Sequence, residues 1–363
     1  MANLDTRNLS VLFSGSEYKE FDIHYSVDSV RKNFPGCEVL LSTNDIGFYQ
    51  KSLKKNIFDK IVFCEVGDEL PCIKAPGMID KSNFVNNNIN KQVPTCLAGI
   101  NAATHDVVLK IRTDQYLLNS NVLKFWNMLT DVPKRNAEKQ GRIITTSVFS
   151  LNPRFRERIL YHIADMMQFG YKSDLINYYS CPEYPFEYSV WYEYNKHNKY
   201  STFEEKLFRS RYAVEQWLSL NYIFSDEAEF PVKYHNDCNP EMIFEYEYFF
   251  PDYFFIVHPE DIGLRNHTKF FDAKHQIDRE CYSTFDSIRF IKSNYGIDLD
   301  PEGLYKNRRE KEDDDEYVFS YGRIFDLSFK FGLIRFVVRN LPYKLKSEVK
   351  RLIRRNKKLK YDV

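Results

Sequence analysis

The sequence lacks several features that would assign it to a common class. Its seven Cys form no CxxC pair and have no His partner at zinc-ligand spacing, and an odd number argues against a disulfide framework. A reducing compartment is therefore expected. The motifs GxGxxG, GxxxxGKS and GxxxxGKT are also missing. Their absence disfavours a dinucleotide-dependent oxidoreductase and a P-loop nucleotide hydrolase.

Export and membrane-spanning signals are missing as well. The N-terminal stretch MANLDTRNLSVLF has no basic region followed by a long apolar run, so we expect no cleaved signal peptide. The most apolar region, 324–341, is interrupted by Lys330, Arg335 and Arg339. A transmembrane helix needs roughly 18 or more uninterrupted apolar residues. We therefore expect a cytoplasmic protein that does not span a bilayer.

The net charge is zero, with 51 basic and 51 acidic residues, but the charges are unevenly distributed. Twelve Lys or Arg lie between Lys330 and Tyr361, opposed only by Glu348. Such a basic end indicates an anionic partner, either membrane lipid or nucleic acid. No nucleic-acid recognition motif accompanies it, so we predict no nucleic-acid partner.

The same segment has the pattern of a basic amphipathic helix. Apolar side chains recur at helical spacing and basic ones surround them; the apolar positions are Leu345, Val349, Leu352 and Ile353. We predict a charged linker over 306–322 and a membrane-associating segment over 323–363, placing the protein on the inner face of the plasma membrane. An ordinary surface helix packed on the body is the alternative.

The first third of the chain alternates predicted strands with predicted helices. Short apolar runs predict strands over 9–14, 38–43, 60–64 and 106–112. Helices are predicted over 21–33 and from Pro94 to about Thr104, since proline fits a first helical turn. This alternation predicts an α/β fold with a doubly wound, mostly parallel sheet and helices on both faces.

Polar side chains follow three of these strands. In doubly wound sheets, ligands bind at the carboxyl ends of the strands, so these side chains should converge on one cleft. They are Ser14, Gly15, Thr43, Asn44, Arg112 and Asp114.

Four blocks of sequence together resemble the WavE-type lipopolysaccharide-synthesis family. They are NINKQ at 88–92, VLKIRTD at 108–114, HIADMMQFG at 162–170 and EQWL at 215–218. The resemblance covers about residues 9–270 and implies a GT-A-like glycosyltransferase domain over 1–305. Within it, 1–120 would bind the nucleotide-sugar and 121–305 the acceptor. The implied activity is sugar transfer during lipopolysaccharide or capsule assembly.

Asp114 resembles the last carboxylate of the metal-binding Asp-x-Asp motif of GT-A enzymes, but Arg112 replaces the first. One carboxylate plus diphosphate oxygens can hold Mg²⁺ or Mn²⁺, and His258, at the end of another predicted strand, is a second candidate ligand. Alternatively, Arg112 or Lys110 neutralises the donor diphosphate directly. Turn capping by Asp114 and a structural ion pair of Arg112 remain open.

Asn90 and Gln92 lie just before the predicted helix at Pro94, and we expect them to contact the nucleotide, with helix capping as the alternative. Glu215 is the candidate base for an inverting transfer, because its position near a helix start is analogous to the acidic motif of inverting GT-A enzymes. It could instead complement the helix dipole. Asp165 is the candidate for binding the acceptor hydroxyl, or it is a structural residue.

The sequence therefore predicts a nucleotide-sugar-dependent glycosyltransferase that extends a lipid-linked or polymeric bacterial glycan. Two alternatives remain. A sugar nucleotidyltransferase would usually carry a basic, Gly-rich first loop, which Ser14-Gly15-Ser16 matches poorly. A membrane-associated polysaccharide-assembly factor would bind without catalysis.

Overall fold

The computed structural model describes residues 4–67, 69–74, 85–155, 157–199, 201, 205–225, 229–266 and 281–306. The predicted linker over 306–322, apart from Lys306, and the predicted membrane-associating segment over 323–363 lie outside the described residues.

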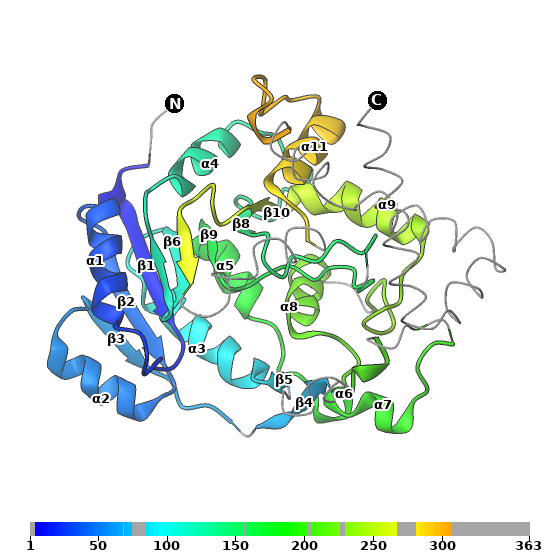
Figure 1. The fold of residues 1–363 in the computed structure, drawn as a ribbon, viewed down its shortest axis with the longest axis horizontal. Coiled ribbons are helices and arrows are strands. Elements are labelled where there is room, and N and C mark those ends of the chain that lie inside the picture. Colours follow the sequence, from blue (N-terminus) through cyan, green and yellow to red (C-terminus); the bar gives the residue numbers. More distant parts are fainter. Residues whose placement is uncertain are drawn as a thin grey trace, which may run out of the picture.

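A seven-stranded sheet forms the centre of the molecule (Figure 1). Its strand order is β10-β8-β9-β6-β1-β2-β3. Six strands run parallel, and β9 is antiparallel to both of its neighbours. The strands are β1 (Leu9–Ser14), β2 (Glu38–Thr43), β3 (Lys60–Phe63), β6 (Val107–Arg112), β8 (Ile143–Thr146), β9 (Gln168–Tyr171) and β10 (Phe254–Val257). The predicted mostly parallel α/β sheet is confirmed.

Helices cover both faces of this sheet, which confirms the doubly wound arrangement. One face packs against α1 (Ile23–Asn33), α2 (Ile46–Lys55), α4 (Val122–Leu129) and α11 (Thr284–Tyr295). The other packs against α3 (Ile89–Ala102), α5 (Lys172–Tyr179), α8 (Val214–Ile223) and α9 (Pro240–Phe249). The remaining elements are α6 (Phe186–Ser189), α7 (Trp191–Tyr194), β4 (Leu70–Lys74), β5 (Val85–Asn87), β7 (Gln115–Leu117), β11 (Leu264–Asn266) and 3-10 turns at Thr6–Asn8, Glu205–Leu207 and Phe250–Asp252.

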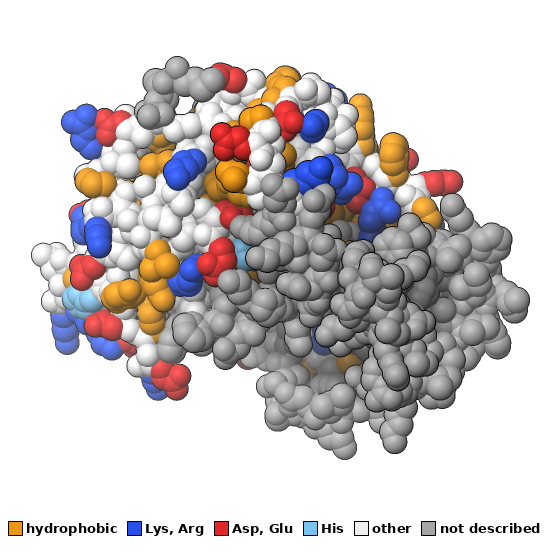
Figure 2. Space-filling view, turned by 45° about the horizontal axis from the view of Figure 1, so that its top comes forward, with side chains coloured by type: hydrophobic (Ala, Val, Ile, Leu, Met, Phe, Trp, Pro, Cys, Tyr) orange, Lys and Arg blue, Asp and Glu red, His pale blue; other side chains and the backbone are white. Residues whose placement is uncertain are grey.

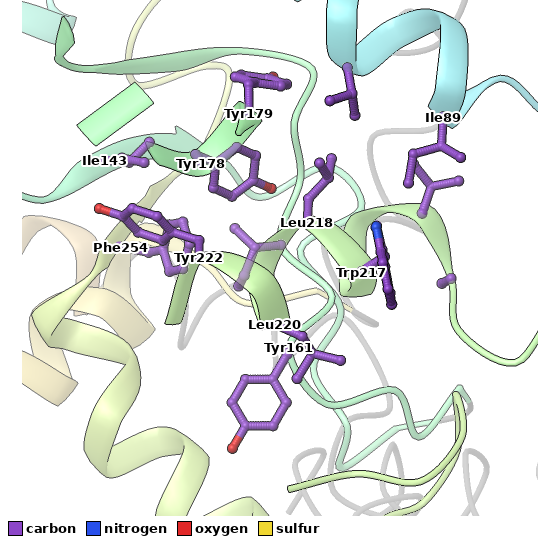
Figure 3. Close-up of a cluster of buried hydrophobic side chains, with 14 of the residues drawn as sticks. Ile89, Ile143, Tyr161, Tyr178, Tyr179, Trp217, Leu218, Leu220, Tyr222 and Phe254 are labelled. Atoms are coloured by element: carbon purple, nitrogen blue, oxygen red, sulfur yellow. The ribbon is translucent and has the colours of Figure 1, made fainter. Parts of the chain in front are cut away.

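Much of the aromatic surplus lies in the core that surrounds α8. Figure 3 shows Tyr178 of α5 close to Tyr222 of α8 and to Phe254 of β10. The rings of Tyr178 and Tyr222 meet edge to face, with centroids 5.5 Å apart. Burial of such rings dominates core energetics. It fixes α8, and with it the residues of its first turn, against the sheet.

Helix α3 differs from its prediction. It begins at Ile89 rather than Pro94, so Pro94 lies inside the helix. The earlier start buries Ile89 and Val93 on the sheet. Asn90 also bonds both ways to the backbone of Tyr184, accepting from its N–H at 2.8 Å and donating to its carbonyl at 3.1 Å. These tertiary contacts outweigh the local preference of proline for the first turn.

On the face shown in Figure 2, Lys and Arg lie beside Asp and Glu over the described surface. Surface ion pairs such as Arg31–Asp59, at 3.1 Å, are examples of this mixing. No described helix combines the length and apolar character that crossing a membrane requires.

Candidate active site

A cleft of about 990 Å³ opens at the carboxyl ends of the central strands. Its walls come from the ends of β1 and β6, from β4, from the N-terminal parts of α3 and α8, and from loop residues between 149 and 166. The parallel register explains why these ends meet, since Ser14 lies opposite both Ser42 and Arg112. A ligand of nucleotide-sugar size fits such a volume.

The loop after β1 turns sharply at Gly15 and is fastened to the neighbouring strands. Gly15 has a φ of +133°, a conformation that side chains other than glycine rarely adopt. Its N–H donates to the carbonyl of Ser42 at 3.1 Å. The Thr113 hydroxyl donates to the carbonyl of Ser16 at 2.6 Å. The backbone of this loop is therefore fixed beside Arg112.

Arg112 forms a bidentate ion pair with the fully buried Asp114, at 2.9 and 3.2 Å. It also donates from Nη2 to the Tyr18 hydroxyl. Burial alone would lower the pKa of Arg112, but the bonds to Asp114 outweigh it and raise the pKa. Nη1 has no hydrogen-bond partner among the described residues. Arg112 is thus a permanently charged, oriented cation on the cleft wall with one donor group to spare.

Lys110, two residues earlier on β6, is a second cation of the cleft, and unlike Arg112 it is buried. Its Nζ donates to the main-chain carbonyl of Asp165 and lies 5.7 Å from the centre of the Tyr179 ring. An ammonium group carries three donors. Within the described part of the chain, the other two have no hydrogen-bond partner.

Helix α3 forms the wall opposite Arg112 because it lies unusually close to the sheet. A Cβ at Gly99 would come within 2.7 Å of the Cβ of Ser42, so only glycine allows this approach. The approach brings the thiol of Cys96 to 3.2 Å from the Ser14 hydroxyl. One turn earlier, the Gln92 amide donates to the carboxylate of Asp165.

Glu215 is the second residue of α8 and lines the cleft opposite His162. Its Oε2 lies 3.4 Å from Nε2 of the His162 ring. The neighbouring Gln216 is fully buried and donates to the carbonyl of Leu160 at 2.9 Å. This bond ties the start of α8 to the segment that carries His162.

The WavE lipopolysaccharide synthesis family model matches residues 14–298, which include every wall of this cleft. The chain belongs to this family. No curated protein sequence matches it.

Among solved structures, the WavE-family chain is similar to several glycosyltransferases. Apo-form GlyE of Streptococcus pneumoniae TIGR4 is 13% identical over 63% of this chain, with a TM-score of 0.30. S. aureus TarS is 12% identical over 82%, with a TM-score of 0.31. The match spans 44% of the length of either structure. The 1–349 portion of TarS in complex with UDP is 13% identical, with 92% of each chain covered and a TM-score of 0.31.

Seven of the predicted site residues line the cleft of this WavE-family chain. They are Ser14, Gly15, Gln92, Lys110, Arg112, Asp165 and Glu215. Asn44, expected in the same convergence, also lines it. Four of the six residues predicted to converge, Ser14, Gly15, Asn44 and Arg112, therefore line one cleft, together with Lys110 and the candidate base Glu215.

Four predicted site residues do not line the cleft: Thr43, Asn90, Asp114 and His258. The Thr43 hydroxyl is buried and accepts from the N–H of Asp45 at 3.0 Å. Both polar atoms of the Asn90 amide are used by Tyr184. His258 accepts from the N–H of Glu260 at 3.2 Å through Nδ1. The polar atoms of these three side chains are engaged in structural hydrogen bonds away from the cleft.

The donor set at Asp114 does not fit a preassembled metal site. Both carboxylate oxygens accept from Arg112, and the side chain is fully buried behind it. The part of the chain that the structure describes contains no group of three or more His, Cys, Asp or Glu placed to hold a metal ion. The prediction of Mg²⁺ or Mn²⁺ at Asp114 and His258 stays a prediction, as does the alternative in which Arg112 or Lys110 neutralises the diphosphate directly.

Sequence reasoning missed His162 as a site residue. The signal was present, because His162 begins the block HIADMMQFG, three residues before Asp165. It was not recognised because its partner, Glu215, lies 53 residues further along the chain. The Lys74–Glu157 ion pair, at 3.0 Å, was missed for the same reason.

Proposed function

We propose that this protein is a glycosyltransferase that moves a sugar from a nucleotide-sugar donor to a lipopolysaccharide or capsular polysaccharide acceptor. The observation that carries the proposal is the convergence, in one cleft, of a buried and a half-buried cation with spare donors, Lys110 and Arg112, and of a carboxylate that can act as a base. Inverting glycosyl transfer needs positive charge for the leaving diphosphate and a base for the proton of the acceptor hydroxyl. Membership of the family supports the polysaccharide class of acceptor.

The donor diphosphate is assigned to Lys110 and Arg112. Buried hydrogen-bond donors aimed at developing charge stabilise it strongly, since they need no reorganisation during the reaction. As the bond from the sugar carbon to the diphosphate oxygen breaks, its electron pair stays on that oxygen and the two cations compensate the charge. The same carbon forms a bond to the acceptor oxygen, whose proton passes to Glu215. Approach from the side opposite the diphosphate makes the transfer inverting.

Binding of nucleotides tests this function directly. We expect UDP or another nucleoside diphosphate, and the matching nucleotide-sugar, to raise the melting temperature of the full chain by several degrees. A ligand at 100 times its Kd adds about 2.7 kcal/mol of stability. The probes are UDP, GDP, UDP-glucose, UDP-galactose, UDP-GlcNAc and GDP-mannose, each by thermal shift and calorimetry, with Mn²⁺ or with EDTA.

Because Lys110 and Arg112 are assigned to hold the diphosphate without a metal ion, EDTA should change the Kd of the nucleotide less than threefold. Binding that disappears in EDTA and returns with Mn²⁺ would overturn the cation assignment and support the predicted divalent ion. If none of the probes binds under either condition, the glycosyltransferase proposal fails. Release of pyrophosphate instead of a nucleoside diphosphate during turnover would indicate a sugar nucleotidyltransferase.

We also propose that the protein acts at an anionic membrane surface, because the sequence after Lys330 is strongly basic. Each basic residue near an anionic surface contributes about 1 kcal/mol. The full-length variant carrying K346Q, K350Q, R351Q and R354Q should therefore bind vesicles with 30% phosphatidylglycerol at least tenfold more weakly in a sedimentation assay. A variant with Gln at the exposed Lys32, Lys54, Lys124 and Lys233 is the matched control. Equal weakening in both would contradict a dedicated docking segment.

A further inference from the structure

The orientation of the His162 ring is fixed by a bond that allows only one tautomer. Nδ1 lies 2.7 Å from the main-chain carbonyl oxygen of Phe149. A carbonyl can only accept, so Nδ1 carries a proton. In the neutral ring, Nε2 is then a lone-pair acceptor, and it is this atom that lies 3.4 Å from Oε2 of Glu215.

Two strained residues hold the ring in this position. Phe149 and Tyr161 are large residues with φ values of 69° and 61°, in the left-handed region. Such a conformation costs about 1–3 kcal/mol for each residue and persists only where surrounding contacts impose it. Phe149 supplies the carbonyl that orients His162, and Tyr161 is the residue directly before His162 in the chain. The Tyr161 ring packs against Tyr246, with centroids 4.6 Å apart.

A pair of acceptors this close to each other attracts a proton. Nε2 of a neutral imidazole and a carboxylate oxygen both present lone pairs, so neither can bond to the other until one proton lies between them. Both groups line the cleft, His162 being 7% exposed and the Glu215 side chain 25% exposed. A hydroxyl bound in the cleft can therefore deliver the missing proton.

We propose that Glu215 and His162 act as one proton acceptor, in which the proton received by Glu215 is held between its Oε2 and Nε2 of His162. This inference rests on the proposed function and deepens it. The acceptor O–H bond breaks, its electron pair forms the bond to the sugar carbon, and the proton joins the pair. The pair must then lose this proton to solvent before the next turnover.

If Glu215 and His162 act as one proton acceptor, turnover should depend on pH in a specific way. Activity should fall at low pH, because a pair that already holds a proton cannot accept another. Imidazole groups ordinarily titrate about two pH units above carboxyl groups. H162Q leaves only the carboxylate, so its acid limb should move to lower pH, while kcat above that limb should fall about tenfold or more. Donor Kd should stay unchanged.

Other charged or titratable groups near the pair also contribute to the dependence of turnover on pH. They are unchanged in the variants, so a difference between profiles reports on the pair itself. From the elements around it they are Asp165, Tyr178 of α5, Lys110 of β6 and the Lys74–Glu157 ion pair.

The experiment combines turnover with a readout that needs no turnover. Nucleoside diphosphate release from the nucleotide-sugars named above, with water as acceptor, is measured against pH for wild type and H162Q. In parallel, NMR follows the His162 ring against pH in wild type and E215Q, with H162Q giving the assignment. In wild type at low pH, we expect the proton on Nε2 of His162 to give a downfield, slowly exchanging signal that E215Q loses, because the carboxylate Oε2 accepts from this atom.

The outcomes distinguish a failure of the proposed glycosyltransferase function from a failure of the proposed Glu215–His162 pair. Wild-type protein that releases no nucleotide from any donor contradicts the proposed function, while the Nε2 proton signal of His162 still decides whether the pair shares a proton. An active wild type with an H162Q variant of equal kcat and unchanged acid limb overturns the pair, as does an Nε2 proton signal that E215Q leaves unchanged. If H162Q does not fold, H162N gives the same readouts, since its amide can still donate to Phe149.

Discussion

Replacing Glu215 with Gln is expected to lower kcat by about 10²- to 10⁴-fold, the range that a positioned general base contributes. The substitution keeps the shape of the side chain but replaces one acceptor oxygen with an amide donor and removes the proton affinity of the carboxylate. Glu215 is not among the residues assigned to the donor diphosphate, so the donor Kd should change less than threefold. Nucleoside diphosphate release measures the first quantity and calorimetry the second.

The control for this variant is Glu241→Gln. Glu241 also lies in the first turn of a helix, α9, but it is exposed and does not line the cleft. If Glu215 only complements the dipole of α8, both variants should lose a similar, small amount of stability, about 0.3–1 kcal/mol, and no activity. An E215Q variant that folds and turns over within threefold of wild type would remove Glu215 as the base.

The sequence was most informative where function depends on regular strands. The apolar runs at 9–14 and 38–43 coincide with β1 and β2, and a parallel sheet brings their carboxyl ends to one edge. The position of Ser14 beside Arg112 follows from this register alone. The convergence of the donor side of the cleft was therefore predictable from local patterns together with one rule of topology.

Side-chain direction was much less predictable. Asp114 and Arg112 are two residues apart, and the sequence allowed either to meet the ligand. The structure buries the side chain of Asp114 completely and leaves the side chain of Arg112 23% exposed on the cleft. Asn90 and Gln92 are likewise two apart on one helix, but Asn90 bonds to Tyr184 and only Gln92 lines the cleft. Partners 73 to 94 residues away decide these directions.

The acceptor side depends even more on distant contacts. His162 meets Glu215 only because Gln216 bonds to Leu160, 56 residues away, and because two residues adopt left-handed backbone conformations. Neither Phe149 nor Tyr161 has a local preference for that conformation. No pattern in the sequence indicates strain of this kind, so the proton-accepting pair becomes visible only in three dimensions.

Replacing Arg112 with Lys should weaken donor binding and lower kcat/KM by about 10²- to 10³-fold, as the loss of one preorganised donor does elsewhere. Lysine keeps the positive charge, but it cannot bond Asp114 in the bidentate geometry that orients the guanidinium. The matched control is Arg135→Lys, which changes the same kind of ion pair, with Asp252 at 2.8 Å, outside the cleft. R135K should leave kcat/KM within threefold of wild type.

Asp114→Asn distinguishes the two roles that the sequence left open for this carboxylate. If Asp114 only orients Arg112, the Asn side chain still accepts one hydrogen bond, so D114N should lose less kcat/KM than R112K, and Mn²⁺ or EDTA should not alter either variant. If Asp114 instead binds a divalent ion together with the diphosphate, D114N should lose more than R112K, and wild-type turnover should stop in EDTA. The order of the two losses, measured at saturating Mn²⁺ and again in EDTA, therefore decides whether the diphosphate is held by the protein's own cations or by a metal.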